Sequence, residues 1–187
     1  MKLVVNTIIA LSLLGCGAVK LSQEGNHVRA ITEADKPNCE YISDVVSRGG
    51  DYLNSYDGNF EAGFNAAMNA VASAGGDAYA IRSSSETGTI YELEAWICGW
   101  NGGKSTAKYQ QATQLQEISA GERVQCDFIK SVAEGSDWGI TKSRNYKGAK
   151  EDALKHIQEA GGDSYYVVNV LKNRYGVGLI IEAWRCN

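Results

Sequence analysis

The chain has 187 residues and a formal net charge of −4, with 18 Lys plus Arg against 22 Asp plus Glu. This balance argues against a nucleic-acid binder, which needs clustered basic residues to displace phosphate counterions, and against electrostatic adhesion to anionic lipid. The length suits one ordinary domain or two small ones, and 21 glycines with a single proline are not the composition of a disordered stalk.

Residues 1–16 have the features of an export signal. Lys2 supplies a positive start, and residues 3–14 form an apolar run with three polar interruptions. This run is too short to cross a bilayer core, which needs about 20 residues, and fits the h-region of a secretory signal. It ends in Leu-Leu-Gly-Cys, which resembles the bacterial lipobox. The resemblance implies removal of residues 1–15 and lipidation of Cys16. An ordinary signal peptide with an incidental cysteine is the alternative.

The residue after the lipobox bears on location. In lipoproteins of this kind, an aspartate there commonly retains the protein in the inner membrane, and this chain has Gly17. We therefore expect a protein anchored by its N-terminal lipid in the bacterial outer membrane and facing the periplasm. Residues 16–38 are predicted to form the anchor and a tether.

The rest of the chain contains a duplicated unit. Three motifs recur in the same order, with shifts in spacing of one or two residues: Cys-Glu-Tyr-Ile at 39–42 and Cys-Asp-Phe-Ile at 126–129, Ala-Gly-Gly-Asp at 74–77 and 160–163, and Glu-Ala-Trp-x-Cys at 94–98 and 182–186. The duplication predicts a first module at 39–98 and a second at 110–187. The glycine-rich residues 99–109 between them have linker composition, which predicts that the modules are separable.

Each module contains two cysteines. An exported protein reaches an oxidising compartment, where disulfides are expected. Four cysteines allow three pairings, and the repeat selects Cys39 with Cys98 and Cys126 with Cys186. Closing a loop of about sixty residues contributes roughly 4 kcal/mol in the chain-entropy model. Free buried thiols are the alternative.

Patterning within the first module predicts a strand, a helix and a hairpin. Residues 39–46 are rich in aromatic and β-branched side chains. An apolar stripe with helical spacing follows, with Asn59 as the expected N-cap and Gly75 as the expected left-handed C-cap. Two strands, 78–82 and 90–98, then flank a polar turn.

The second module repeats this pattern over 126–133, a helix between Asn145 and Gly161, and strands 164–172 and 178–186. The predicted fold class is α+β: two tandem β-α-β-β modules, each an antiparallel sheet covered by one helix and closed by a disulfide. Residues 25–28 and 121–124 are weakly similar to each other and are interpreted as a further repeated motif ahead of each module.

A family resemblance follows from these features. The lipobox, the short tether, the opening cysteine, the amphipathic helix ending at a glycine turn and the closing Trp-x-Cys resemble a bacterial lipoprotein domain of unknown function. That domain looks related to the globular part of the Rcs envelope-stress sensor lipoprotein. The sensor has a proline-rich tether and four cysteines in one domain, whereas each module here has two. The resemblance implies fold and location more directly than signalling.

No motif for catalysis, metal or cofactor binding emerges from the sequence. His27 and His156 lie far apart, and no His-Cys-carboxylate spacing suggests a metal. Glu94 and Glu182 are the carboxylates of the strongest motif, and we interpret them as solvated or sheet-edge residues rather than as catalytic ones. Their neighbours Trp96 and Trp184 are expected to pack against the disulfides or a sheet face. The sequence therefore predicts a non-enzymatic protein without a cofactor.

The loop between first strand and helix is the predicted contact surface. Asp51 and Tyr52 are matched by Asp137 and Trp138, and Tyr and Trp dominate interface hot spots. The alternative is that both aromatic residues fold back into the core. The sequence thus favours an interaction module that binds an envelope protein, in sensing or scaffolding. A structural envelope lipoprotein, or a ligand-binding or enzymatic cleft between the modules, are the rivals.

Overall fold

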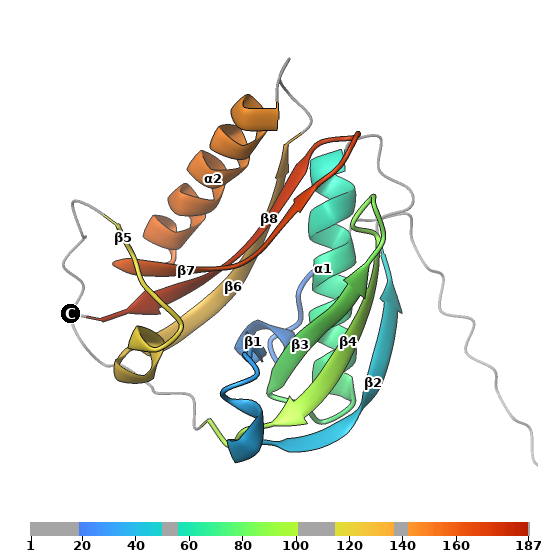
Figure 1. Ribbon diagram of the computed structural model, residues 1–187, viewed down its shortest axis with the longest axis vertical. Coiled ribbons are helices and arrows are strands. Elements are labelled where there is room, and N and C mark those ends of the chain that lie inside the picture. The colour runs from blue at the N-terminus through green and yellow to red at the C-terminus, as the bar shows by residue number, and fades with distance from the viewer. Residues whose placement is uncertain (1–18, 50–55, 101–114, 137–141, 187) are drawn as a thin grey trace, which may run out of the picture.

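The computed structural model describes residues 19–49, 56–100, 115–136 and 142–186 (Figure 1). It confirms the α+β class and the two modules, each closed by its predicted disulfide, Cys39–Cys98 and Cys126–Cys186. The first module comprises η1 Gly25–His27, β1 Arg29–Ala30, η2 Lys36–Asn38, β2 Glu40–Arg48, α1 Tyr56–Ser73, β3 Ala78–Ser84 and β4 Ile90–Ile97. The second comprises β5 Gln116–Glu117, η3 Glu122–Gln125, β6 Asp127–Ser136, α2 Lys142–Glu159, β7 Ser164–Lys172 and β8 Val177–Arg185.

The backbone retains the duplication closely. The strand orders are β1-β3-β4-β2 in the first sheet and β5-β7-β8-β6 in the second. Both sheets show an irregularity at the same place, between Tyr41 and Ser43 and between Phe128 and Lys130. In both modules the aspartate after the Gly-Gly pair accepts the backbone N–H of the closing cysteine, at 2.7 Å for Asp77 and 2.9 Å for Asp163.

Each sheet gains one strand beyond the prediction. β1 and β5 run parallel to β3 and β7 at one sheet edge, so the sheets are mixed rather than purely antiparallel. β1 belongs to the segment 16–38 that the sequence assigned to a tether. From residue 19 onward that segment packs on the fold, with Val28 and Ala30 buried. A strand of two residues is too short to produce a readable period, which explains the omission.

Two asparagines of α1 fasten the start of this segment. The Asn65 Nδ2 donates to the Val19 carbonyl at 3.1 Å, and the Asn69 Nδ2 donates to the Lys20 carbonyl at 2.9 Å. The Asn69 Oδ1 also accepts the backbone N–H of Ser22 at 2.8 Å. The chain therefore joins the first module at residue 19.

The segments that precede Cys39 and Cys126 match each other in a different register from the one predicted. η2 and η3 occupy matching places, and each is preceded by a side-chain turn: Asp35 accepts the Thr32 N–H at 2.7 Å, and Glu122 accepts the Ser119 N–H at 2.6 Å. Lys36 is thus the counterpart of Arg123, and the match of 25–28 with 121–124 is wrong. The spacing to the cysteine is conserved.

The helix ends confirm one part of the prediction and correct another. Gly75 and Gly161 adopt left-handed φ values of +87° and +80°, as C-caps should. Asn59 and Asn145 are not N-caps, because α1 begins at Tyr56 and α2 at Lys142. Each helix begins one turn before the predicted cap, and in α1 this first turn packs on the core through Tyr56.

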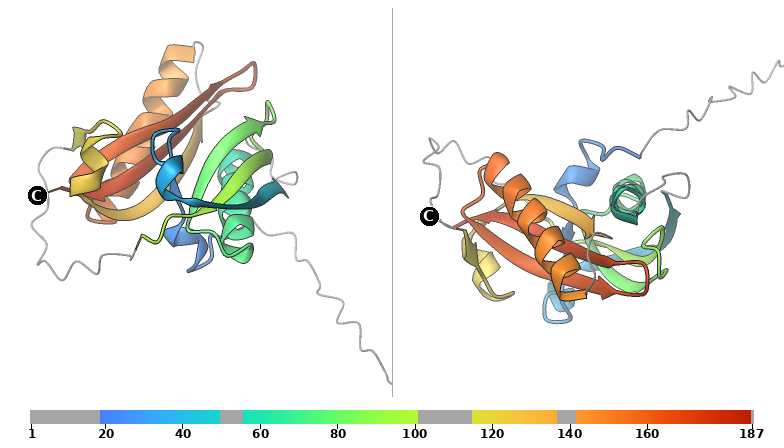
Figure 2. Two further views of the ribbon diagram at one scale, coloured as in Figure 1. Left: turned by 60° about the horizontal axis from the view of Figure 1, so that its bottom comes forward. Right: turned by 90° about the horizontal axis from the view of Figure 1, so that it is seen from above.

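The modules share one of the two buried hydrophobic clusters of the fold. In Figure 1, α1 lies between the two sheets and α2 covers the far side of the second sheet; both views in Figure 2 agree. Ile180 and Ala133 of the second sheet belong to the same buried cluster as Phe60 and Val28 of the first module. A Cβ on Gly178 would collide with the Phe60 ring. The described parts of the two modules are therefore packed together through this shared cluster, while a second cluster, under α2, belongs to the second module alone. The separability that the linker composition predicts stays a prediction.

Candidate functional site

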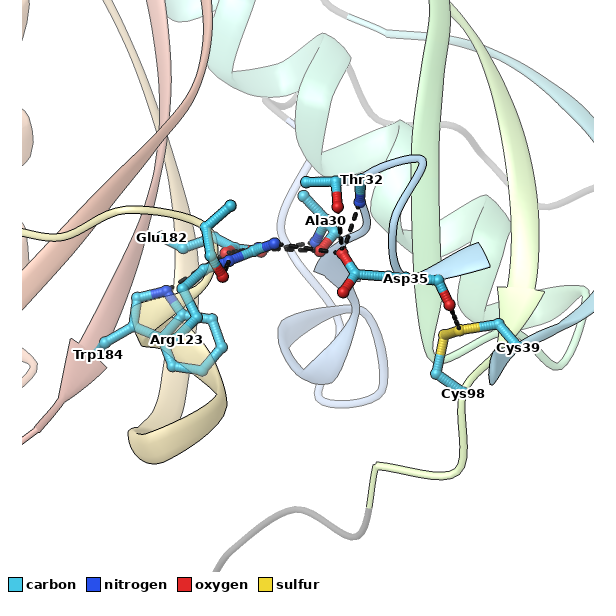
Figure 3. Close-up of polar contacts among 9 residues, drawn as sticks. Ala30, Thr32, Asp35, Cys39, Cys98, Arg123, Glu182 and Trp184 are labelled. Carbon is cyan, nitrogen blue, oxygen red and sulfur yellow. Dashed lines mark hydrogen bonds and ion pairs between the residues drawn. A yellow bond between two sulfur atoms is a disulfide. The ribbon is translucent and has the colours of Figure 1, made fainter. Parts of the chain in front are cut away.

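A buried carboxylate lies at the junction of the modules. Glu182, on β8, has 0 % of its surface exposed. It accepts hydrogen bonds from the Ala30 backbone N–H at 2.5 Å, from the Arg123 Nη1 at 2.9 Å and from the Trp184 Nε1 at 3.3 Å. Figure 3 shows these groups converging from β8, from η3 and from the edge strand β1 of the other module.

Arg123 completes the junction. Its Nη1 also donates to the Ala30 carbonyl at 3.1 Å, and its Nη2 lies 3.4 Å from the Asp35 Oδ2. One guanidinium thus connects η3, β8 and the segment that follows β1 (Figure 3). Removing one partner of such a buried pair leaves the other charge buried and uncompensated, which is strongly destabilising. The network therefore fixes how the first module sits on the second.

The electrostatics of Glu182 reflect its position. Burial raises the pKa of this carboxyl, because the charged form loses water, while the charge of Arg123 and the Ala30 N–H act in the opposite direction. All three of its named hydrogen-bonding partners are donors, which matches the needs of a carboxylate. This is the arrangement of a structural ion pair, and it replaces the solvated or edge glutamate that we expected from the sequence.

The first module contains the same constellation without a cover. Glu94 pairs with the Lys36 Nζ at 2.9 Å and accepts from the Trp96 Nε1 at 3.1 Å. The Arg82 Nε adds a contact at 2.9 Å, and the Glu94 side chain is 12 % exposed. Partial burial opposes ionisation, yet the hydrogen bonds from Lys36 and Arg82 outweigh it, so the pKa of Glu94 lies below its usual value.

The chemistry of the two outer sheet faces explains this difference. Here the outer face means the face turned away from the module's own helix. The first sheet places Glu92 and the 69 %-exposed Val46 where the second sheet has Ile180 and Ala133, both buried. The second outer face can therefore be covered by α1 and β1. The first remains charged and open.

A cleft opens beside the junction network. It has a volume of about 190 Å³ and is lined by Arg29, Asp35, Trp100, Ala120, Arg123, Val124, Cys126 and Trp184. The guanidinium of Arg29 stacks on Trp100, 3.1 Å from the ring centre, and lies 5.9 Å from that of Trp184. The cleft thus combines arginine and tryptophan, two of the residue types that are enriched in interface hot spots.

The guanidinium of Arg29 has no acceptor within the described part of the chain. Among the residues that the structure describes, no hydrogen bond or ion pair reaches its guanidinium, unlike that of Arg123. Its burial lowers its pKa to about 10, against the attraction of Glu182 and Asp77. A partly buried guanidinium that keeps free donors is able to bind an anionic group.

A second, larger hollow of about 400 Å³ lies between α1 and β6 and includes Val19, Asn65, Lys130, Glu134 and His156. His156 lies 3.3 Å from Glu134 and 3.4 Å from Glu159. Its lining charges are mixed, and none of the aromatic rings described above borders it. We therefore take the Arg29 cleft as the candidate site.

The remaining predicted sites divide between those shown and those outside the described residues. The four disulfide cysteines are paired as predicted. Cys16 and the contact residues Asp51, Tyr52, Asp137 and Trp138 lie outside the described residues. Within the described ranges, no group of three His, Cys, Asp or Glu could hold a metal ion. No helix there has the length and apolar character to span a membrane.

Comparison with known proteins gives no match to a family model, a curated protein or a solved structure. The sequence motifs and the geometry of the module junction are therefore the features that bear on function.

Proposed function

We propose that this chain is a lipid-anchored protein of the bacterial cell envelope that binds another envelope protein, in sensing or scaffolding. The observation that carries the proposal is the cleft at the module junction, where Trp100 and Arg29 are held in place beside a fixed ion-pair network. Export and anchoring are supported by the order of signal, lipobox and Cys16. The resemblance to envelope lipoproteins points to the same location.

The size of the cleft favours a protein partner over a metabolite. Small-molecule sites usually enclose about 300–1,000 Å³, and this cleft has about 190 Å³. Such a volume accommodates one side chain or terminal group of a larger partner. A small ligand or a reaction in the cleft is the second candidate, because the cleft is lined by convergent polar groups. The loop residues Tyr52 and Trp138 remain a predicted additional contact.

Photo-crosslinking in intact cells followed by affinity capture tests the proposal. The wild-type protein should capture a reproducible envelope partner, and Trp100→Ala should lose most of that capture. Tyr175→Ala is the matched control, since Tyr175 is an exposed aromatic on the β7–β8 hairpin. Equal capture by all three would remove the cleft from the interface. Envelope defects in a deletion strain that shows no captured partner would favour a purely structural role.

A further inference from the structure

Arg29, which has no acceptor among the residues that the structure describes, is not required by the fold of the module. Arg29 lies opposite Ala78 at the edge of the first sheet, and the matching position of the second sheet, opposite Ser164, is Gln116. The second module therefore forms the same edge with a neutral amide. Strand pairing therefore does not explain why an arginine occupies position 29.

The other charged groups around Arg29 already have partners. Arg123 is bound to Glu182 and Asp35. Asp35 also accepts from the N–H and the hydroxyl of Thr32, both at 2.7 Å. Asp77 accepts the backbone N–H groups of Cys98 at 2.7 Å and Trp100 at 3.3 Å. Arg29 is the charged group of the cleft that keeps its donors free among the described residues.

The stacking on Trp100 leaves a defined set of donors. A guanidinium is planar, and its N–H groups lie in that plane. Trp100 covers one face of the Arg29 guanidinium, so the N–H edges stay available and the side chain is held in one orientation. A planar carboxylate fits such an edge through two parallel hydrogen bonds.

We infer that this cleft binds a single carboxylate of a partner polypeptide through the N–H edge of Arg29, with Trp100 supporting the guanidinium from its face. The inference rests on the proposal that the partner is a protein. A dianion such as phosphate is disfavoured, because Asp35 lines the cleft and the charges of Asp77 and Glu182 act on Arg29. A monoanionic carboxylate meets half of that repulsion. It can come from a chain terminus or from an Asp or Glu side chain.

The test is a titration of the purified mature protein in non-ionic micelles, followed by the ¹H–¹⁵N resonances of the Arg29 Nε–H and the Trp100 indole. Three probes separate the sources: N-acetylglycine presents a terminal carboxylate, N-acetyl-aspartyl-N-methylamide presents a side-chain carboxylate, and N-acetylglycinamide presents neither. We expect saturable shifts with one or both acids, at dissociation constants on the order of millimolar for so small a contact, and none with the amide. The tighter acid identifies the source.

Arg29→Gln places in the first module the residue that the second module has, so the fold should tolerate it. This variant should lose affinity for the acid at least about tenfold, as expected for a hydrogen bond to a charged group. Arg174→Gln is the control, because Arg174 stacks on Tyr175 at 4.7 Å outside the cleft. Equal binding of acid and amide, undiminished binding by Arg29→Gln, or a response to inorganic phosphate alone would overturn the inference. Specific acid binding without any captured partner in cells would instead refute the proposed function and leave the site standing.

Discussion

The repeat offers an internal comparison between a covered and an uncovered copy of one glutamate. Glu182→Ala removes a carboxylate that accepts three hydrogen bonds at the module junction. Arg123, whose side chain is 6 % exposed, loses its closest anionic partner. Breaking one side of a buried pair costs about 3–5 kcal/mol. Glu94→Ala removes the equivalent, partly buried carboxylate, but its partners Lys36 and Arg82 keep 20 % and 51 % of their side chains exposed and can turn to water. The cost should therefore be close to the value of a surface pair, about 0–1 kcal/mol.

The assay is thermal unfolding of both variants and of the wild-type protein, followed by Trp fluorescence and by circular dichroism. In a chain of this size, the expected loss for Glu182→Ala corresponds to a fall in Tm on the order of 10 °C. Because the junction joins both modules, the loss should appear in one common transition. The double variant Glu182→Leu with Arg123→Leu should recover most of it, since two apolar side chains leave no charge stranded. Equal costs for Glu182→Ala and Glu94→Ala would refute this reasoning.

Three further predictions follow from the shared core and the ionised groups. Gly178→Ala should destabilise the protein by about 1–3 kcal/mol in a thermal melt, because its methyl group would meet the Phe60 ring. A fragment of residues 110–187, oxidised, should bind a hydrophobic dye and show no cooperative melt, because Ile180 loses its cover. The pKa of Glu94 is lowered from its ordinary 4.5, so the stability it contributes should be present above pH 4.5 and lost on acidification below it. Glu94→Gln should reduce that acid sensitivity in denaturant titrations.

The duplication and the disulfides could be predicted from the sequence because both are encoded locally. Cysteine spacing selects one pairing once the repeat is recognised, and a glycine after an apolar stripe indicates a helix end. The docking of the modules does not follow from the repeat itself, because it depends on the residues in which the two copies differ. The sequence contains these differences: the position of Glu92 in the first module is Ile180 in the second, and the position of Asp44 is Ser131. Alternate strand positions that turn from charged to uncharged indicate a face that becomes covered.

The candidate cleft was harder to anticipate. Arg29 belongs to a two-residue strand and Trp100 follows the last strand of its module, so neither residue lies in a periodic pattern. They meet because β1 pairs with the start of β3, which lies opposite the end of β4, and Trp100 follows that end. Lys36 and Arg123 occupy equivalent positions in η2 and η3, and the change from Lys to Arg marks the junction. The two residues can be compared only after these two 3-10 turns have been aligned.

The hydrogen bonds from Asn65 and Asn69 to residues 19 and 20 limit how far the folded domain can lie from a membrane to which Cys16 is anchored. Only two residues separate Cys16 from Val19 in the sequence. A chain spans at most about 3.6 Å per residue, so three steps reach roughly 11 Å. If Cys16 carries the proposed lipid, the folded body rests against the headgroup layer with α1 near the membrane, and it has no stalk. A partner would then have to come to the membrane surface, or already be part of it.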